Sequence, residues 1–213
     1  MINDERIISF INSFGTDENG IIGDVEREAL KDDVPIIRKE TRSFIRSMLL
    51  IKKPMRILEV GTAVGFSSIY MCRYMPEGCH ITTVENWEPR CCKARVNFER
   101  AGVSDRVTLI EEDAAVVLAD LKDEFDFIFM DAAKGQYINF LPDVIRLLRK
   151  DGVLISDNVL QDGEVLDSRY IVERRKRTIH GRMREYLYEL THNQLLDTSI
   201  IPLGDGIALS VRI

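Results

Sequence analysis

The stretch ILEVGTAVGFSS, residues 57–68, joins a short apolar run to a loop that contains two glycines, Gly61 and Gly65. The run from Met55 to Val60 predicts a β-strand, and the residues after Gly65 predict a helix from the spacing of their apolar positions. Glycines between a strand and a helix let the backbone approach a ligand closely at the carboxyl edge of a sheet, where open α/β folds bind. The stretch therefore predicts the first strand, loop and helix of an α/β fold.

Short apolar runs alternate with helical stretches from Met55 to Asp157. This alternation predicts βαβ crossovers, and hence a doubly wound, mostly parallel sheet with helices on both faces. After Asp157 we expect a long charged helix at about 167–191, then two strands joined by a glycine turn at Gly204–Gly206, which form an antiparallel pair at one edge. The seven expected strands lie at 55–60, 80–85, 106–111, 125–130, 152–157 and twice within 198–213; the helices between them lie at 67–75, 89–102, 114–121 and 137–150, the last interrupted by Pro142.

The bulk composition fits one compact domain over residues 1–213. The chain is 45% hydrophobic and 30% charged, with a helical N-terminal appendage expected at 1–51 and the ligand-binding core at 55–213. No apolar run is long enough to span a membrane, and the N-terminus carries acids where a signal peptide carries basic residues, so we expect a cytoplasmic protein. The four cysteines have no metal-ligand spacing, which favours reduced thiols.

Acidic residues end the first three expected strands. Glu59 closes the first strand, Glu85 closes the second, and Asp113 with Ala114 follows the third. The loop at 61–65 lacks the GxGxxG pattern that holds a pyrophosphate, and Glu59 would repel phosphate but suit an amine. An acid at the place of Glu85 commonly binds two ribose hydroxyls. A ligand with an amine, a ribose and an adenine but no phosphate is S-adenosylmethionine; the alternative is that the glycines serve only the turn and the acids only cap helices.

The apolar run FDFIFM, residues 125–130, ends on Asp131, and the next strand ends on Asp157 and Asn158. The two strand ends are neighbours in a doubly wound sheet, so the three oxygen-bearing side chains can converge and suit a hard cation such as Mg²⁺. A cation there would lower the pKa of an acceptor hydroxyl, and Lys134 could accept its proton. The alternatives are that the acids cap the following helices and that Lys134 is a solvated surface residue.

These motifs resemble those of the metal-dependent O-methyltransferases of the catechol methyltransferase type. The resemblance rests on LEVGTAVGFSS, DAAKGQY and SDN and covers nearly the whole chain, although Glu112 stands where many relatives have glycine. It implies a Rossmann-like methyltransferase sheet, metal on Asp131, Asp157 and Asn158, and catalysis by Lys134 with Asp131. It also implies S-adenosylmethionine contacts at the Ile37 backbone and at Glu59, Gly61, Ser67, Glu85, Asp113, Ala114 and Asp131.

Within that family, DAAKGQYINF, DNVL and IIPLGDGIALS are most similar to the bacterial enzymes that methylate 5-hydroxyuridine in tRNA. This similarity implies that the chain makes 5-methoxyuridine at the wobble position. In 5-hydroxyuridine the 5-hydroxyl lies beside the 4-carbonyl, so the two oxygens could chelate a metal as a catechol does. The acceptor expected from this similarity is the anticodon loop of a tRNA.

A basic segment supports a nucleic-acid acceptor on independent grounds. Residues 165–185 contain seven Arg or Lys against three acids, although the whole chain has a net charge of −6, which argues against a general nucleic-acid coating protein. Clustered cations are the electrostatic footprint of a tRNA partner. The expected contacts are Arg174, Arg175, Lys176 and Arg177, with Tyr170, Tyr186 and Tyr188 as a stacking face. The alternative is a solvated charged helix with its tyrosines facing the core.

Three other functions stay open on the sequence alone. The first is a catechol or caffeoyl-type O-methyltransferase that acts on small molecules, the second a nucleotide-dependent oxidoreductase, and the third a non-catalytic RNA-binding module. The missing GxGxxG argues against the second, and the complete set of Asp131, Lys134, Asp157 and Asn158 argues against the third. The apolar faces of the N-terminal helices also lead us to expect a homodimer.

Overall fold

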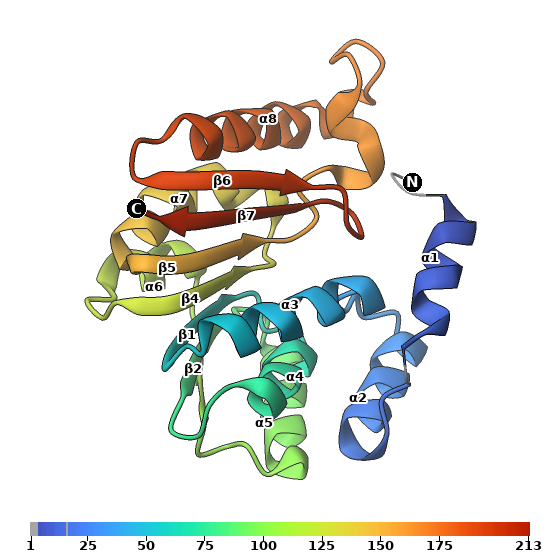
Figure 1. Cartoon of the computed structure of the whole chain (residues 1–213), viewed down its shortest axis with the longest axis vertical. Helices are drawn as coiled ribbons and strands as arrows, with labels where there is room; N and C mark the ends of the chain where they lie inside the picture. The colour runs from blue at the N-terminus through green and yellow to red at the C-terminus, as the bar shows by residue number, and fades with distance from the viewer. Residues whose placement is uncertain (1–3, 16) are drawn as a thin grey trace.

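The computed structural model describes residues 4–15 and 17–213, so residues 1–3 and 16 of the expected N-terminal appendage lie outside the described residues. The strands form one seven-stranded sheet in the order β3-β2-β1-β4-β5-β7-β6 (Figure 1). The first five strands are parallel, and β7 runs antiparallel to both β5 and β6. The predicted fold class is therefore confirmed. The strands are β1 (Arg56–Val60), β2 (His80–Val84), β3 (Val107–Ile110), β4 (Phe125–Met130), β5 (Leu148–Ser156), β6 (Leu196–Ile201) and β7 (Ile207–Arg212).

Successive residues of the central strands face two separate cores. In β4, Phe127 and Phe129 pack into one core, whereas Ile128 and Met130 pack into the other. Side chains alternate across a strand, and all six residues of β4 are buried because helices cover both faces. This double burial explains why β4 reads as a continuous apolar run and not as an alternating one.

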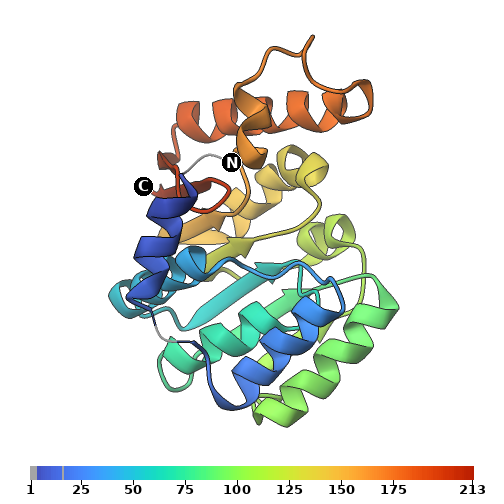
Figure 2. The same cartoon turned by 90° about the vertical axis from the view of Figure 1, so that its right-hand side faces the viewer.

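The helices divide between the two faces of the sheet, as Figure 2 shows from the side. Residues of α2, α3, α4 and α5 complete one core, and residues of α6, α7 and α8 complete the other. The division follows from right-handed crossovers, because the chain reverses its direction across the sheet after β3. The helices are α1 (Glu5–Ser13), α2 (Gly20–Lys31), α3 (Lys39–Lys52), α4 (Phe66–Tyr74), α5 (Glu88–Ala101), α6 (Ala114–Asp120), α7 (Tyr137–Leu147) and α8 (Arg177–His192).

The predicted charged helix at 167–191 is wrong in its first ten residues. The helix α8 begins at Arg177, and short 3₁₀ turns occupy Gln161–Leu166 and Arg174–Lys176. Tyr170, Ile171 and Val172 are consecutive rather than three or four apart, so they cannot form one buried helical face; only Val172 is buried, and Tyr170 is 88% exposed. The segment 167–176 therefore projects from the body as an irregular loop (Figures 1 and 2).

The helix α7 differs from its prediction in two ways. It runs through Pro142 without interruption, and it ends at Leu147, where β5 begins four residues earlier than expected. A register shift between Phe125 and Phe127 accommodates the first part of β5, because Leu148 pairs with Phe125 before the regular ladder resumes at Val153. Sequence periodicity could not separate the end of an apolar helix from the start of a buried strand.

The first helix lies apart from the body of the fold. It packs on α3, and all its residues remain at least partly exposed, including Ile7, Phe10 and Ile11, as does Phe14, which directly follows the helix. No helix among the described residues is long and apolar enough to cross a membrane. The division of the chain into appendage and core stays a prediction.

Candidate functional site

The glycine loop after β1 touches the end of β4. Gly61 has a φ of 104°, and a Cβ placed on it would overlap the backbone carbonyl of Asp131. Only glycine fits, because both the positive φ and the contact exclude a side chain. The backbone N–H groups of Gly61 and Thr62 donate to the Val84 carbonyl, 3.0 and 3.2 Å away. The ends of β1, β2 and β4 are thereby fixed beside one another.

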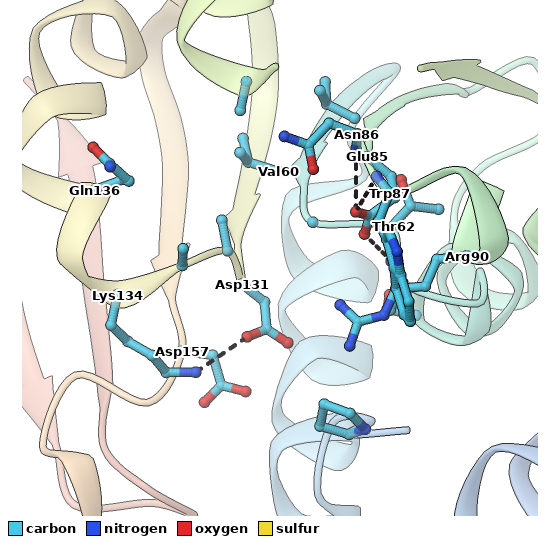
Figure 3. A pocket seen from close by; sticks show the side chains of 18 of the residues that line it. Val60, Thr62, Glu85, Asn86, Trp87, Arg90, Asp131, Lys134, Gln136 and Asp157 are labelled. Atoms are coloured by element: carbon cyan, nitrogen blue, oxygen red, sulfur yellow. Dashed lines mark hydrogen bonds and ion pairs between the residues drawn. The ribbon is translucent and has the colours of Figure 1, made fainter. Parts of the chain in front are cut away.

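A cavity of about 770 Å³ opens at this carboxyl edge of the sheet. It is lined by the segment before α3, by the glycine loop and by the ends of β2, β3, β4 and β5 (Figure 3). Ten of the predicted site residues line it, so the structure brings together segments that are far apart in the chain. These residues are Ile37, Gly61, Ser67, Glu85, Asp113, Ala114, Asp131, Lys134, Asp157 and Asn158.

Glu85 is held rigidly on the β2 side of the cavity. One carboxylate oxygen accepts from the backbone N–H groups of Asn86 and Trp87, each at 3.1 Å, and the other accepts from that of Ala63 at 3.0 Å (Figure 3). The three backbone donors fix the carboxylate and leave lone pairs directed at the cavity. A carboxylate fixed in this way can accept hydrogen bonds from a pair of ligand hydroxyls.

Asp113 has two roles in the structure. It lines the cavity and it also caps α6, because its carboxylate accepts from the Ala115 N–H at 2.8 Å. The capping alternative is therefore correct for this residue without excluding a contact with the adenine. Glu112 also lines the cavity, where many relatives have glycine.

Glu59 is placed differently from the other predicted cofactor residues. It is fully buried in β1 beneath the cavity and does not line it. One carboxylate oxygen accepts from the hydroxyls of Ser68 and Thr83, while Oε1 has no partner within the described residues. Burial raises the pKa of Glu59 to about 7, although the nearby hydroxyls of Ser67, Ser68 and Thr83 oppose this shift. Ser67 lies between Glu59 and the cavity, so a cofactor amine would reach Glu59 through that hydroxyl.

The buried carboxyl of Glu59 predicts a pH-dependent stability. The folded protein holds the Glu59 proton up to a pKa of about 7, whereas the ordinary pKa is 4.5, so stability falls as the pH rises between these values. Relative to Glu59→Gln, the wild-type protein should lose up to about 3 kcal/mol over that range, since one pKa unit corresponds to about 1.4 kcal/mol. Urea denaturation of both ligand-free proteins at pH 5, 6, 7 and 8 measures this difference; a difference that does not change with pH contradicts the prediction.

Asp131, Asp157 and Asn158 converge at the ends of β4 and β5. The Asp157 N–H donates to the Met130 carbonyl at 3.0 Å, which aligns the two strand ends. Burial raises the pKa of Asp131 despite the nearby Lys134, and burial together with the charge of Asp131 raises the pKa of Asp157 to about 7. A cation bound between two such carboxyls would favour their ionised forms. The donor set of two carboxylates and an amide oxygen fits Mg²⁺, although the described residues contain no cluster of three His, Cys, Asp or Glu side chains.

Lys134 lies on the same side of the cavity, in the 3₁₀ turn after β4. Its Nζ donates to the Asn158 amide oxygen at 2.9 Å and lies 3.9 Å from the Asp131 carboxylate (Figure 3). The side chain is 34% exposed, so Lys134 is neither a free surface lysine nor a fully enclosed one. Its ammonium group therefore lies beside the side chains that end β4 and β5.

Sequence reasoning missed two side chains on the β2 side of the cavity, Trp87 and Arg90. The Arg90 guanidinium stacks over the Trp87 ring, 5.1 Å from its centroid, and its buried Nε has no partner in the described part of the chain. Both residues line the cavity beside Glu85 (Figure 3). The sequence offered one signal for them, because Trp87 stands two residues after the strand-end acid Glu85. In the structure the Trp87 side chain is 55% exposed.

The basic segment lies beside the cavity and does not line it. Lys176 pairs with Glu164, Arg175 pairs with Glu173, and the Arg177 guanidinium donates to the Val172 and Tyr170 carbonyls. Of the four residues predicted to bind tRNA, only Arg174 is without such a partner among the described residues, and Tyr186 is buried. Arg182 donates to the Gly135 carbonyl at 2.9 Å, which ties α8 to the turn that carries Lys134.

Comparison with known proteins identifies the family of this chain. A family model described as O-methyltransferase matches residues 13–213. A catechol O-methyltransferase of Mycobacterium tuberculosis is 33% identical over 165 residues, which cover 73% of this chain and 71% of that protein. A catechol O-methyltransferase of Niastella koreensis is 30% identical over 177 residues, which cover 79% and 78%.

Solved structures show the same fold. An O-methyltransferase from Bacillus cereus in complex with SAH has a TM-score of 0.86 at 23% identity, over 98% of this chain and 97% of that one. The O-methyltransferase TomG from Streptomyces achromogenes in complex with SAM has a TM-score of 0.86 at 22% identity, over 100% and 99%. The chain therefore belongs to the O-methyltransferase family, as an S-adenosylmethionine-dependent enzyme of the catechol and caffeoyl-CoA type.

Proposed function

We propose that this enzyme transfers the methyl group of S-adenosylmethionine to the 5-hydroxyl of 5-hydroxyuridine at the wobble position of tRNA, which gives 5-methoxyuridine. The observation that carries the proposal is the position of the basic segment. Arg182 joins α8 to the turn of Lys134, and the exposed cations of 169–175 directly precede this helix. A tRNA could place one unpaired base in the cavity while its phosphates meet these cations.

Each wall of the cavity has a separate task in this proposal. Glu85 binds the ribose hydroxyls of the cofactor, and the glycine loop with Ser67 and the Ile37 backbone binds its methionine end. Asp131, Asp157 and Asn158 would hold Mg²⁺, which would supply a lowered pKa for an acceptor hydroxyl bound there. Lys134 acts as the base for the hydroxyl proton; the acceptor oxygen then forms its bond to the methyl carbon as the bond from carbon to sulfur breaks, which leaves S-adenosylhomocysteine. Catalysis arises from positioning and electrostatics.

A second candidate acceptor is a small catechol or caffeoyl-type molecule. The named relatives favour it, since two catechol O-methyltransferases are 30% and 33% identical to this chain, and a caffeoyl-CoA O-methyltransferase of Populus kitakamiensis is 27% identical over 80% of it. A catechol presents the same vicinal oxygen pair as 5-hydroxyuridine. The cavity side chains alone are therefore compatible with either acceptor. The basic segment is the feature that supports a tRNA rather than a small molecule.

A comparison of methyl transfer to the two acceptors tests the proposal. The purified enzyme is supplied with radiolabelled S-adenosylmethionine, Mg²⁺, and either tRNA that contains 5-hydroxyuridine or a panel of catechols and caffeate derivatives. We expect a higher kcat/KM for the tRNA, and label recovered as 5-methoxyuridine. Efficient turnover of a catechol with no label in the tRNA would assign the enzyme to the second candidate.

The proposal predicts that two exposed arginines contribute to tRNA affinity. Arg169 and Arg174 are exposed and have no hydrogen-bond or ion-pair partner in the described residues. Reversing both charges, with Arg169→Glu and Arg174→Glu, should raise the KM for tRNA about tenfold or more and flatten its dependence on salt, because fewer counterions are released on binding. Filter binding and initial rates at several salt concentrations measure both effects.

The matched control reverses two exposed lysines at the opposite edge of the sheet. Lys122 precedes β4, and Lys150 lies in the first residues of β5. Both are at the amino ends of the strands, away from the cavity. Lys122→Glu with Lys150→Glu makes the same change in net charge. An equal loss of tRNA affinity in both double variants would mean that net charge, and not the basic segment, governs binding.

Two further expectations belong to the same proposal. The exposed apolar side chains of α1 favour a homodimer in which a second copy covers Ile7, Phe10, Ile11 and Phe14. A tRNA substrate favours the cytoplasm as the place of action. Light scattering of the purified protein and of a Phe10→Glu variant tests the first expectation.

A further inference from the structure

Arg38 lies at a solvent-exposed part of the cavity wall, which we call the entrance. It directly follows Ile37, whose backbone is expected to contact the cofactor, and it lines the cavity. Its guanidinium lies 3.3 Å from the carboxylate of Asp162, a residue 124 positions later in the chain. Asp162 itself follows the metal-binding pair Asp157 and Asn158 by only a few residues. The ion pair therefore lies between the segment expected to contact the cofactor and the loop that follows the residues expected to hold the metal.

The loop that presents Asp162 is held in place by the last hairpin. The N–H of Asp162 donates to the Asp205 carboxylate, and those of Val159 and Leu160 donate to the carbonyls of Gly206 and Asp205, each at 3.0 Å. Gly204 lies against Arg38 and its neighbour Thr41. The position of Asp162 is thus set by the backbone of two loops and does not depend on its pairing with Arg38.

The Arg38 pair is suited to exchange partners. The Arg38 side chain is 37% exposed and the Asp162 side chain 58% exposed, and ion pairs with this exposure contribute little to stability. An arginine that faces a carboxylate can instead form a two-point hydrogen-bonded pair with a phosphate, which is a stronger contact. The free energy lost when Arg38 leaves Asp162 is therefore smaller than the free energy that a contact with a phosphate would contribute.

The charge of the cavity also requires such a residue for an anionic acceptor. Five carboxylates line it, from Glu85, Glu112, Asp113, Asp131 and Asp157, against three described cations. Of these cations, Lys134 is bonded to Asn158, and Arg90 stacks on Trp87 on the β2 side. Arg38 is the remaining cation in the described lining, and it stands at the entrance.

We propose that Arg38 binds a backbone phosphate of the acceptor RNA, the 5′-phosphate of the target nucleotide, and that Asp162 is its partner only while the acceptor is absent. The C5 edge of an anti pyrimidine lies on the side of its own 5′-phosphate, so a base with its 5-hydroxyl at the metal-binding edge directs that phosphate toward the entrance. This inference rests on the proposed tRNA function, and it makes Arg38 a specificity residue that distinguishes a nucleotide acceptor from an uncharged catechol.

A double-mutant cycle between protein and RNA tests the contact. The acceptors are anticodon stem-loop RNAs with a single 5-hydroxyuridine, made with ordinary phosphates or with one neutral methylphosphonate at the 5′-phosphate of that nucleotide. We expect the methylphosphonate and the Arg38→Leu variant each to raise KM about tenfold. In the combination, the second change should add less than about twofold, because both changes remove the same contact. Losses that multiply would overturn the inference.

Two controls separate the contact from a structural effect. A methylphosphonate at the 3′-phosphate should give losses that multiply with Arg38→Leu, and calorimetry should show that this variant still binds S-adenosylhomocysteine with wild-type affinity. Asp162→Asn releases Arg38 from its resting partner and should lower KM for the ordinary RNA; a raised KM would contradict the exchange. If the wild-type enzyme methylates catechols and none of the RNAs, the tRNA function itself fails, and that outcome is distinct from RNA turnover that is insensitive to Arg38.

Discussion

Asp157→Ala should lower turnover about 1000-fold or more while the dissociation constant of S-adenosylhomocysteine stays within about threefold of the wild-type value. Asp157 is 2% exposed, and its carboxylate faces Asp131 at the metal-binding edge, on the opposite side of the cavity from Glu85. The substitution removes one of the two carboxylates proposed as metal ligands and leaves the β2 side of the cavity in place. Initial rates at saturating cofactor, calorimetry with S-adenosylhomocysteine and titration with Mn²⁺ measure turnover, cofactor binding and metal binding separately.

The matched variant Asp157→Asn distinguishes a metal ligand from a structural residue. The ordinary pKa of 3.8 is raised to about 7 in the fold, so the folded protein loses stability as the pH rises between these values and bears the whole cost of the buried charge at pH 8. Asparagine carries no charge. Ligand-free Asp157→Asn should therefore unfold at a higher temperature than wild type at pH 8, yet lack activity. A lower unfolding temperature with loss of S-adenosylhomocysteine binding would assign Asp157 to the fold instead.

Gly61→Ala should destabilise the protein by about 4 kcal/mol or more and abolish cofactor binding. The alanine would have to adopt a φ of 104°, and its methyl group would overlap the Asp131 carbonyl. The strands β1 and β4 could then not keep their spacing. Urea denaturation and S-adenosylhomocysteine calorimetry measure the two effects. The same substitution disturbs Asp131, so any remaining folded protein should also be inactive.

Gly163→Ala is the control for the backbone conformation alone. Gly163 has a φ of 92°, but a Cβ there would have no neighbour within 4 Å. The cost should be limited to the strain of a positive φ, about 1–2 kcal/mol. Equal destabilisation by the two alanines would mean that the contact between the glycine loop and Asp131 does not constrain the site.

The parallel sheet was predictable because its determinants are local in the sequence. Each strand is a short apolar run that ends on a polar residue or a glycine, and the carboxyl ends of parallel strands must meet at one edge. This rule alone brings Glu85, Asp131 and Asp157 to the same cavity. The prediction of a common site needed no knowledge of side-chain geometry.

The start of α8 and the burial of Glu59 were not predictable, because both depend on tertiary contacts. The segment 167–176 is charged enough for a surface helix, but it lacks a spaced apolar face and is held by the Arg177 contacts with the Val172 and Tyr170 carbonyls. Glu59 occupies a strand end as expected, yet its side chain points into the protein toward Ser68 and Thr83. Because β1 is buried on both faces, its apolar residues do not alternate with polar ones. The sequence therefore could not indicate which way the Glu59 side chain points.

The pairing of Arg38 with Asp162, and of Arg90 with Trp87, shows a second limit. Both pairs lie in loops or at helix starts, where neither residue has a periodic pattern, and Arg38 and Asp162 are 124 positions apart. Only the fold brings Arg38 to the cavity entrance. Residues that determine the choice of acceptor are therefore harder to find from sequence than those that bind the cofactor.

Mass spectrometry of tRNA nucleosides from cells that lack this protein tests the central claim most directly. If the enzyme methylates the wobble nucleoside, 5-methoxyuridine should disappear and 5-hydroxyuridine should accumulate. Expression of the wild-type protein should restore 5-methoxyuridine, and expression of Asp157→Asn should not. Unchanged 5-methoxyuridine in the deletion strain would contradict the tRNA assignment and leave the small-molecule acceptor as the function of this cavity.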